Sequence, residues 1–349
     1  MKKLLALLLC AVLCLSLAAC ASNATTTETP AASTETAAEA PTETETAEAP
    51  AEEASSDAKQ YVVGICQLVQ HDALDAATNG FMDALEEALP GQVTFDLKNA
   101  SNDIPTCGTI VTGFVASNVD LILANATPAL QAASTATQTI PILGTAVTEY
   151  GVALDIKDFS GTVGGNISGT SDLAPLDQQA DMLLELLPEA QNVGILYCSA
   201  EANSVYQADV VKAALEAKGV NVTVYTFADS NDVATVTQTA CAENDALYIP
   251  TDNTAASCTE AINNVAEPAG VPIVAGEEGI CKGCGIATLS IDYYELGKTT
   301  GAMAAKILTG EANVSEMPIE YYQNPVKKYD AARCEALGIT VPADYVAIG

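Results

Sequence analysis

The chain has few basic residues. It holds 13 Lys and Arg against 45 Asp and Glu, which gives a formal net charge of −32 over 349 residues. A protein that binds nucleic acid needs a basic face to neutralise phosphates, so we expect no nucleic-acid partner.

Catalytic patterns are scarce as well. His71 is the single histidine, and the chain contains neither G-x-S-x-G nor a glycine-rich phosphate loop. An enzyme would need a nucleophile with a base, or two carboxylates at a defined separation. We therefore expect no enzymatic activity and no cofactor.

The most reactive motif left is Cys281-Lys-Gly-Cys284. No second C-x-x-C accompanies it, so a four-ligand zinc site is not expected. A thioredoxin-like pair would begin a helix after the first strand, whereas this pair is expected in a loop before residues 286–290. A small loop disulfide or two free thiols are favoured, with metal or cluster binding as the alternative. Eight cysteines follow Cys20, and the sequence does not give their pairing.

The longest apolar run lies at the N-terminus. Lys2 and Lys3 precede a run from Leu4 to Leu17, and small residues then lead to Cys20. This pattern is typical of a lipoprotein signal peptide over residues 1–19, after which Cys20 carries the lipid. We expect an extracytoplasmic protein anchored to the outer face of the cell membrane. An ordinary signal peptide is the alternative.

Residues 20–58 read as a disordered acidic linker that begins at the lipidated Cys20. Residues 21–58 are small, polar or acidic, with no aromatic residue, Lys or Arg. Such a segment cannot build a hydrophobic core, and its carboxylates repel one another. We expect an extended tether.

From residue 59 onward the chain repeats itself with an offset of about 130 residues. Val63-Gly-Ile65 returns as Val193-Gly-Ile195, and VTFDLKNASND at 93–103 returns as VTVYTFADSND at 222–232. Two further strand-like runs follow in the same order. Chance similarity between two α/β units is the alternative to a duplication.

Helical patterns separate these apolar runs. They lie at 73–89, 104–117, 128–138, 204–218, 232–242 and 255–268. Short Val- and Ile-rich strands that alternate with helices predict parallel sheets covered on both faces. The fold class is therefore α/β, with two doubly wound lobes. Ligands of such sheets lie beyond the carboxyl ends of the strands, so we expect a site between the lobes.

The loops at these strand ends are rich in hydroxyls, amides and carboxylates. Only Lys98 and Lys282 lie near an expected carboxyl end, so an anion such as phosphate is a weak candidate. A zwitterion fits better, because helix N-termini and hydroxyls can hold its carboxylate while Asp or Glu receives its ammonium.

Several runs resemble one family in order and spacing from about Tyr61 to about Tyr322. They are Ala146-Val-Thr-Glu-Tyr150, Gly165-Asn-Ile-Ser-Gly-Thr-Ser-Asp172, Glu201-Ala-Asn-Ser204, Tyr248-Ile-Pro-Thr-Asp-Asn253, Ala275-Gly-Glu277 and Ser290-Ile-Asp-Tyr-Tyr-Glu-Leu-Gly297. The chain thus resembles the tryptophan/tyrosine-type substrate-binding proteins of ABC transporters. One departure is Asp72, which follows His71 where relatives usually carry proline.

The resemblance implies a type I periplasmic-binding fold whose lobes are joined by a three-crossing hinge. We expect crossings near Thr170, Ser290 and Met317. The N-terminal lobe would then comprise 59–169 and 291–317, and the C-terminal lobe 170–290 and 318–349.

The resemblance also implies a set of ligand-facing residues. Asp252 or Asp292 is expected to bind an ammonium, while Thr127, Ser171 and Ser204 address a carboxylate. The full set is Gln67, His71, Thr127, Thr148, Ser171, Asp172, Asn203, Ser204, Thr251, Asp252, Asn253, Glu277 and Asp292.

These residues also have plainer interpretations. Asp172, Ser204 and Asn253 could cap helices, and His71 could be a surface loop residue. Five tyrosines in or near these runs could form an aromatic wall for a flat ligand or simply fill the core. They are Tyr150, Tyr197, Tyr248, Tyr293 and Tyr294.

The expected function is the extracytoplasmic solute-binding component of an ABC importer, which closes its lobes around a small ligand. An L-aromatic amino acid is favoured, and a sugar or nucleoside is the alternative. The expected partners are the permease, its ATPase, and the membrane through the lipid on Cys20. A ligand-sensing subunit that docks on a membrane receptor is the other alternative.

Overall fold

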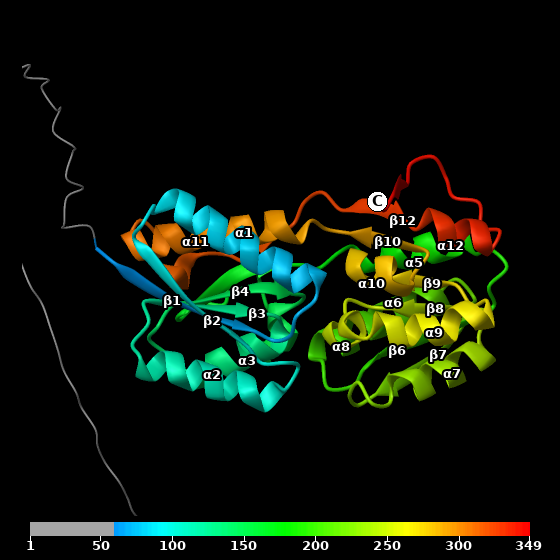
Figure 1. Cartoon of the computed structure of the whole chain (residues 1–349), viewed down its shortest axis with the longest axis horizontal. Coiled ribbons are helices and arrows are strands. Elements are labelled where there is room, and N and C mark those ends of the chain that lie inside the picture. The colour runs from blue at the N-terminus through cyan, green and yellow to red at the C-terminus, as the bar shows by residue number, and fades with distance from the viewer. Residues whose placement is uncertain (1–58) are drawn as a thin grey trace, which may run out of the picture. The chain divides into compact units, whose positions relative to one another are not determined.

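Two sheets, each covered on both faces by helices, make up residues 59–349, which the computed structural model describes (Figure 1). The expected signal peptide, Cys20 and the acidic linker lie outside the described residues. No helix within 59–349 has the length and apolar character needed to cross a membrane.

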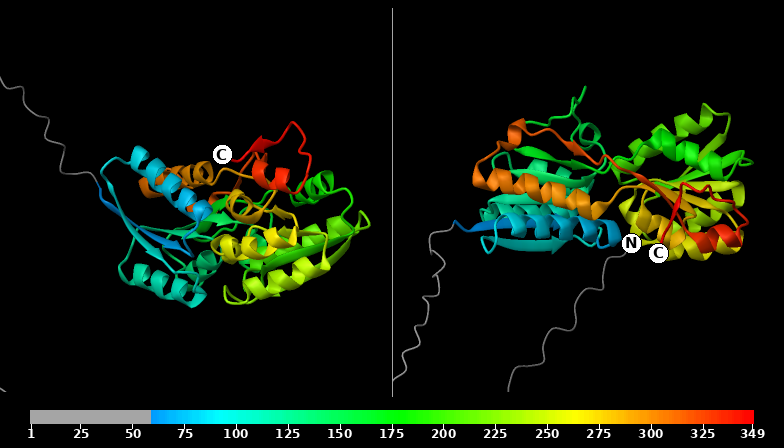
Figure 2. Two further views of the ribbon diagram at one scale, coloured as in Figure 1. Left: turned by 45° about the vertical axis from the view of Figure 1, so that its right-hand side comes forward. Right: turned by 90° about the horizontal axis from the view of Figure 1, so that it is seen from above.

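The first sheet has the strand order β11-β5-β4-β3-β1-β2, with every pair parallel. Its strands are β1 (Tyr61–Gln67), β2 (Val93–Asn99), β3 (Leu121–Asn125), β4 (Ile142–Val147), β5 (Ile167–Ser171) and β11 (Glu320–Tyr321). Helices α1 and α11 cover one face, and α2 and α3 cover the other (Figures 1 and 2). The helices of this lobe are α1 (Asp72–Ala88), α2 (Ile104–Ala116), α3 (Thr127–Ala136), α4 (Tyr150–Ala153), α11 (Tyr293–Thr309) and the 3-10 turn η1 (Val314–Glu316).

The second sheet has the order β13-β12-β10-β9-β8-β6-β7, and only the β10–β12 pair is antiparallel. Its strands are β6 (Asn192–Cys198), β7 (Asn221–Phe227), β8 (Ala246–Ile249), β9 (Ile273–Ala275), β10 (Ala287–Ser290), β12 (Val326–Tyr329) and β13 (Val346–Ala347). Its helices are α5 (Leu176–Leu186), α6 (Ala202–Glu216), α7 (Val233–Glu243), α8 (Asn253–Ser257), α9 (Thr259–Ala269), α10 (Glu278–Cys284) and α12 (Ala331–Ala336).

Five strands of each sheet share one order. The series β5-β4-β3-β1-β2 matches β10-β9-β8-β6-β7, and the strands occur in the same sequence along the chain. The predicted class, α/β with two doubly wound parallel lobes, is confirmed. One expected helix differs: residues 255–268 lie across α8 and α9, because Cys258 leaves helical geometry at φ −122° and ψ 18°.

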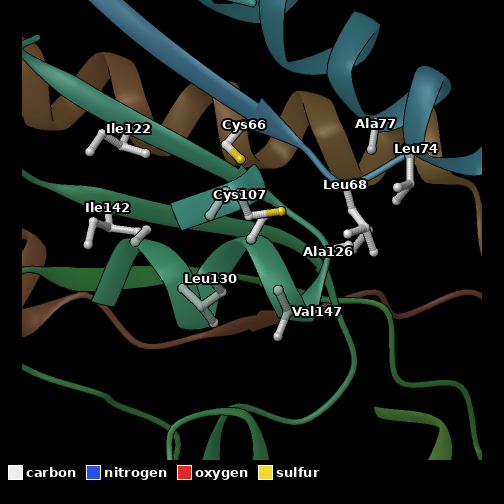
Figure 3. Close-up of a cluster of buried hydrophobic side chains, with 14 of the residues drawn as sticks. Cys66, Leu68, Leu74, Ala77, Cys107, Ile122, Ala126, Leu130, Ile142 and Val147 are labelled. Carbon is white, nitrogen blue, oxygen red and sulfur yellow. The ribbon is translucent and has the colours of Figure 1, made fainter. Parts of the chain in front are cut away.

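The first lobe has a core on each face of its sheet. One lies between β1, β3 and β4 and the helices α2 and α3, and the other lies against α1 and α11. Every residue of β3 and β4 is buried, as expected for parallel strands covered on both faces. Figure 3 shows Ile122, Leu130 and Ile142 of this cluster, with the sulfur atoms of Cys66 and Cys107 among the apolar side chains.

Glycines allow α1 and α11 to pack with their backbones in contact. A Cβ at Gly297 would lie 2.1 Å from the carbonyl oxygen of Ala77, and one at Gly80 would lie 2.1 Å from that of Tyr294. No larger residue fits there without moving a helix. This contact fixes α11 to the first lobe, although the chain reaches it from the second.

The chain passes between the two sheets at 172–175, 291–292 and 322–325. The first two passages lie close to the expected positions near Thr170 and Ser290. The third comes after the expected position near Met317, because Glu320 and Tyr321 pair with Thr170 and Ser171 at the edge of the first sheet.

Candidate functional site

A small cavity lies between the lobes, and side chains from both of them line it. The first lobe and its hinge contribute His71, Ala73, Leu74, Ala146, Thr148, Asp172 and Tyr293. The second lobe contributes Asn203, Thr251, Asp252, Asn253, Ala256 and Glu277.

Sheet geometry explains why these residues meet. Thr148 directly follows β4, Asp172 follows β5, Thr251 follows β8 and Glu277 follows β9. Each polar residue therefore stands at the carboxyl end of a parallel strand or at the start of a helix, as the strand-end rule predicts.

Most of the ligand-facing residues expected from the sequence line this cavity. They are His71, Thr148, Asp172, Asn203, Thr251, Asp252, Asn253 and Glu277. Their role in binding stays a prediction.

The other expected residues do not line the cavity, and their bonds explain why. The Gln67 side chain bonds Asp75 at 2.6 Å and Thr78 at 2.7 Å within the first lobe. Ser171 donates to the carbonyl oxygen of Thr148 at 2.7 Å. Thr127 is buried in the first turn of α3.

Ser204 and Asp292 also point elsewhere. Ser204 donates to Asp252 Oδ2 at 2.7 Å and is fully buried. Asp292 is exposed and caps α11 by accepting a bond from the backbone N–H of Glu295 at 3.1 Å. Neither side chain contributes to the cavity wall.

Asp172 is the carboxylate with unused bonding capacity. It is 4% exposed, and its Oδ2 accepts a hydrogen bond from the hydroxyl of Tyr293 at 2.9 Å. Its Oδ1 is buried and has no hydrogen-bond partner. Burial raises the pKa of this carboxyl group, and the bond from Tyr293 opposes that shift.

Asn203 offers a second unused acceptor from the opposite lobe. Its Nδ2 donates to the carbonyl oxygen of Thr251 at 3.1 Å, while its Oδ1 is buried without a partner. Buried polar atoms are rarely left unpaired. The two unpaired oxygens make Asp172 and Asn203 candidates for contacts with a ligand that has N–H donors.

Asp252 and Glu277, in contrast, already have donors. Asp252 caps α8 and accepts bonds at 2.7 Å from the N–H groups of Cys198 and Ala255, besides the Ser204 hydroxyl. Glu277 caps α10 through the N–H groups of Gly279 and Ile280. Burial raises the pKa of Asp252, helped by the nearby charge of Glu201, and burial raises the pKa of Glu277 to about 7.

Polar contacts join the lobes next to the cavity. His71 Nε2 lies 3.2 Å from Asn253 Oδ1, and burial lowers the pKa of the imidazole. Asp72 and Lys282 form an exposed ion pair at 3.7 Å, a kind of pair that contributes little to stability. His71 is thus an interlobe residue and not a free surface side chain.

Sequence reasoning missed two features of the site. Glu201 stands in the run Glu201-Ala-Asn-Ser204, which gives no sign of its role, although it is 2% exposed and accepts five hydrogen bonds. The cavity also has a small apolar wall, made by Ala73, Leu74, Ala146 and Ala256. Alanines give no chemical signal in a sequence, so only the fold reveals this wall.

The tyrosines divide between the two interpretations. The Tyr293 ring lines the cavity. Tyr150 and Tyr248 are fully buried and donate their hydroxyl groups to Thr170 and Gln179 inside the lobes. Most of these aromatic rings therefore fill the cores.

The cysteines of residues 59–349 are all unpaired thiols. Cys281 and Cys284 lie on α10 and not in the expected loop, and burial raises the pKa of Cys284 to about 12. A thiol with such a pKa is a poor nucleophile at neutral pH. Residues 59–349 contain no cluster of His, Cys, Asp and Glu arranged to hold a metal ion.

Comparisons with known proteins agree with this architecture. Residues 62–346 match the family described as ABC transporter substrate binding protein. The chain is 36% identical over 272 residues to a tyrosine-binding protein of Clostridioides difficile (strain R20291), covering 77% of this chain and 78% of that protein.

Two solved structures are similar over most of the described residues. An ABC domain from Streptococcus pneumonia in complex with L-Trp has a TM-score of 0.78 at 30% identity, covering 82% of this chain and 97% of that chain. A ligand-free, open substrate binding protein from Clostridium difficile has a TM-score of 0.63 at 35% identity, covering 82% and 99%. The lobes thus form a type I periplasmic-binding-protein-like fold, and the chain belongs to the ABC transporter substrate-binding protein family.

Proposed function

We propose that the interlobe cavity binds one amino acid, most favourably an L-aromatic one, for an ABC importer. The observation that carries the proposal is the pair of unpaired acceptors, Asp172 Oδ1 from the first lobe and Asn203 Oδ1 from the second. An ammonium group placed between them would satisfy both.

Charge supports an ammonium in this position. The cavity wall contains the carboxylates of Asp172, Asp252 and Glu277 and neither Lys nor Arg. Hydrogen bonds between an ammonium and a carboxylate are about twice as strong as neutral ones. Because Asp252 and Glu277 already accept backbone N–H groups and Asp292 is exposed, Asp172 is our candidate receptor.

The ligand carboxylate needs donors. The hydroxyl-bearing Thr148 and Thr251 line the cavity from opposite lobes, together with His71. Ser171 and Ser204, which the sequence favoured for this role, donate inside their own lobes. We therefore propose Thr148 and Thr251 for the carboxylate.

Apolar surface in the cavity wall favours an amino acid with a flat side chain. Ala73, Leu74 and the Tyr293 ring offer a surface against which an aromatic ring can pack. The relatives that bind tyrosine and L-Trp point to the same ligand class.

We further propose that binding closes the lobes. The structure resembles the L-Trp complex more than the ligand-free, open relative, although the latter is more similar in sequence. The three passages at 172–175, 291–292 and 322–325 would act as the hinge. The ligand would shift the open–closed equilibrium by its greater affinity for the closed state.

We also propose that the protein delivers its ligand to a permease with its ATPase. A lipid on Cys20 would anchor the protein outside the cell. The lipoprotein pattern of residues 1–20 and the family membership support it. A sensing subunit that docks on a membrane receptor is the second candidate, because the same lobes could serve it.

Calorimetry with the twenty amino acids, a sugar and a nucleoside tests the ligand class. We expect one L-aromatic amino acid to bind with micromolar affinity or better, on the order of −8 kcal/mol. Binding of a sugar or nucleoside, with no amino acid bound, would refute the assignment.

A further inference from the structure

Glu201 is a buried carboxylate that the proposed ligand contacts do not use. It accepts hydrogen bonds from the backbone N–H groups of Asn253 at 3.0 Å and Thr254 at 2.8 Å. It also accepts from their side chains, Asn253 Nδ2 at 2.6 Å and Thr254 Oγ1 at 2.8 Å. One carboxylate therefore holds the first two residues of α8.

The same two residues reach across to the first lobe. Asn253 Oδ1 lies 3.2 Å from His71 Nε2, and Thr254 Oγ1 accepts a bond from Asn102 Nδ2 at 3.0 Å. We call these two hydrogen bonds the latch. Both of its second-lobe atoms belong to residues that Glu201 holds.

The carboxylate of Glu201 sets the direction of both latch bonds. An ionised carboxylate can only accept, so Asn253 must turn its amide nitrogen toward Glu201 and its oxygen toward His71. The hydroxyl proton of Thr254 likewise goes to Glu201, which leaves only a lone pair for Asn102. The second lobe presents two acceptors, and the first lobe must supply two donors, His71 Nε2–H and the Asn102 amide.

Glu201 also contacts a residue of the cavity. Its Oε2 accepts a bond from Asn203 Nδ2 at 3.3 Å, the same amide whose Oδ1 faces the cavity without a partner. We propose that Glu201 is a positioning residue that couples ligand capture to lobe closure by orienting Asn203 for the ligand and the latch for the first lobe. This inference rests on the proposed function, because the ligand ammonium is the donor expected to bond Asn203 Oδ1.

Asn102→Asp tests the latch without touching the cavity. The substitution keeps the shape of the side chain but replaces the donor with an acceptor that faces the Thr254 oxygen. Stopped-flow binding of the amino acid found by calorimetry should show dissociation about tenfold faster with an unchanged association rate. An unchanged dissociation rate would overturn the inference.

Asn99→Asp is the matched control. It adds the same charge three residues earlier, at the end of β2. There the exposed Asn99 accepts a hydrogen bond within the first lobe, from the backbone N–H of Ser101 to Oδ1 at 2.7 Å. An aspartate can accept that bond equally well. Wild-type rates are expected.

The role of Glu201 is tested by combining substitutions. In a Glu201→Gln background the new amide can donate to the hydroxyl oxygen of Thr254. The hydroxyl proton of Thr254 is then free to bond the carboxylate introduced at position 102. The cost of Asn102→Asp should then fall from about tenfold to below about threefold. An equal cost in both backgrounds would refute the directional role. Should Glu201→Gln not fold, a Thr254→Val background serves instead. Because valine lacks the hydroxyl oxygen that faces position 102, Asn102→Asp should no longer speed dissociation there.

A ligand-independent measurement separates this inference from the proposed function. Spin labels on exposed sites of α2 and α7 report the distance between the lobes of the ligand-free full chain. Asn102→Asp should shift this distance toward the open state relative to Asn99→Asp. If no amino acid binds the wild-type protein, the proposed function fails, while an unchanged distance in Asn102→Asp refutes the latch itself.

Discussion

Replacing Asp172 with Asn isolates the charge proposed to hold the ligand ammonium. The substitution keeps the side-chain shape, so the cavity should retain its volume. Tyr293 donates to Oδ2 in the native protein, which leaves Oδ1 for the ligand. In Asp172→Asn, the amide nitrogen can face the ammonium, which places a donor against a donor. Alternatively it can donate to the Tyr293 hydroxyl, which leaves a neutral oxygen for the ammonium, so the charged hydrogen bond is lost in both arrangements.

The size of the effect follows from the bond that is lost. A hydrogen bond to a charged group contributes about 1.5–3 kcal/mol, which corresponds to a loss in affinity of roughly ten- to hundredfold. The unfolding free energy of the ligand-free protein should not fall. Burial raises the pKa of Asp172, so the ionised carboxylate is costly in the empty cavity and the neutral amide removes that cost.

Calorimetry and thermal unfolding of the same samples measure both quantities. Asp292→Asn is the matched control, since Asp292, like Asp172, lies in a passage between the lobes but is exposed and outside the cavity. It should bind the ligand as the wild type does. Native affinity in Asp172→Asn, or an equal loss in Asp292→Asn, would refute the assignment of the ammonium site.

Three further predictions concern the lobes and their buried carboxylates. Asp252→Ala should lower the unfolding free energy by roughly 3 kcal/mol in chemical denaturation, because three donors lose their acceptor. Gly297→Val should lower the unfolding free energy by roughly 3 kcal/mol, because the valine side chain would collide with the Ala77 carbonyl. Gly113→Ala, with open space around its Cβ, should not lower the unfolding free energy. Between about pH 5 and about pH 8 the unfolding free energy of the ligand-free protein should fall, on the order of 3 kcal/mol from Glu277 alone. The folded pKa of Glu277, about 7, exceeds the unfolded value, so the folded state binds more protons over this range. An unfolding free energy that stays constant over this range would contradict the burial argument. In the same titration, ligand affinity should rise with pH as Asp172 ionises.

The sequence carries enough information to place the strands, most helices and the edge where the ligand site lies. The offset of about 130 residues between similar runs predicts two lobes of equal topology, and the sheets share five strands in one order. This succeeds because buried parallel strands impose long apolar runs, and polar residues collect where those runs end. The edge strand β11 escapes prediction because its two residues, Glu320 and Tyr321, are exposed.

The roles of individual carboxylates could not be predicted in the same way. Asp172, Asp252 and Glu277 all follow a strand and all precede a helix, so their local sequences look alike. What separates them is the number of donors that reach each one from elsewhere in the fold, including the Cys198 backbone and the Tyr293 hydroxyl. Such partners are distant along the chain and leave no local pattern.

Near α8, the residues proposed to bind the ligand differ from those that join the lobes, and this separation affects how ligand specificity can evolve. In the proposed mechanism, Asp172, Asn203 and the alanines of the cavity wall recognise the ligand, while the two bonds between the lobes use His71, Asn102 and the first residues of α8. A change of one alanine can therefore alter which side chain is admitted without altering the machinery that shuts around it. Ligand specificity and lobe closure can then evolve at separate rates within one gene.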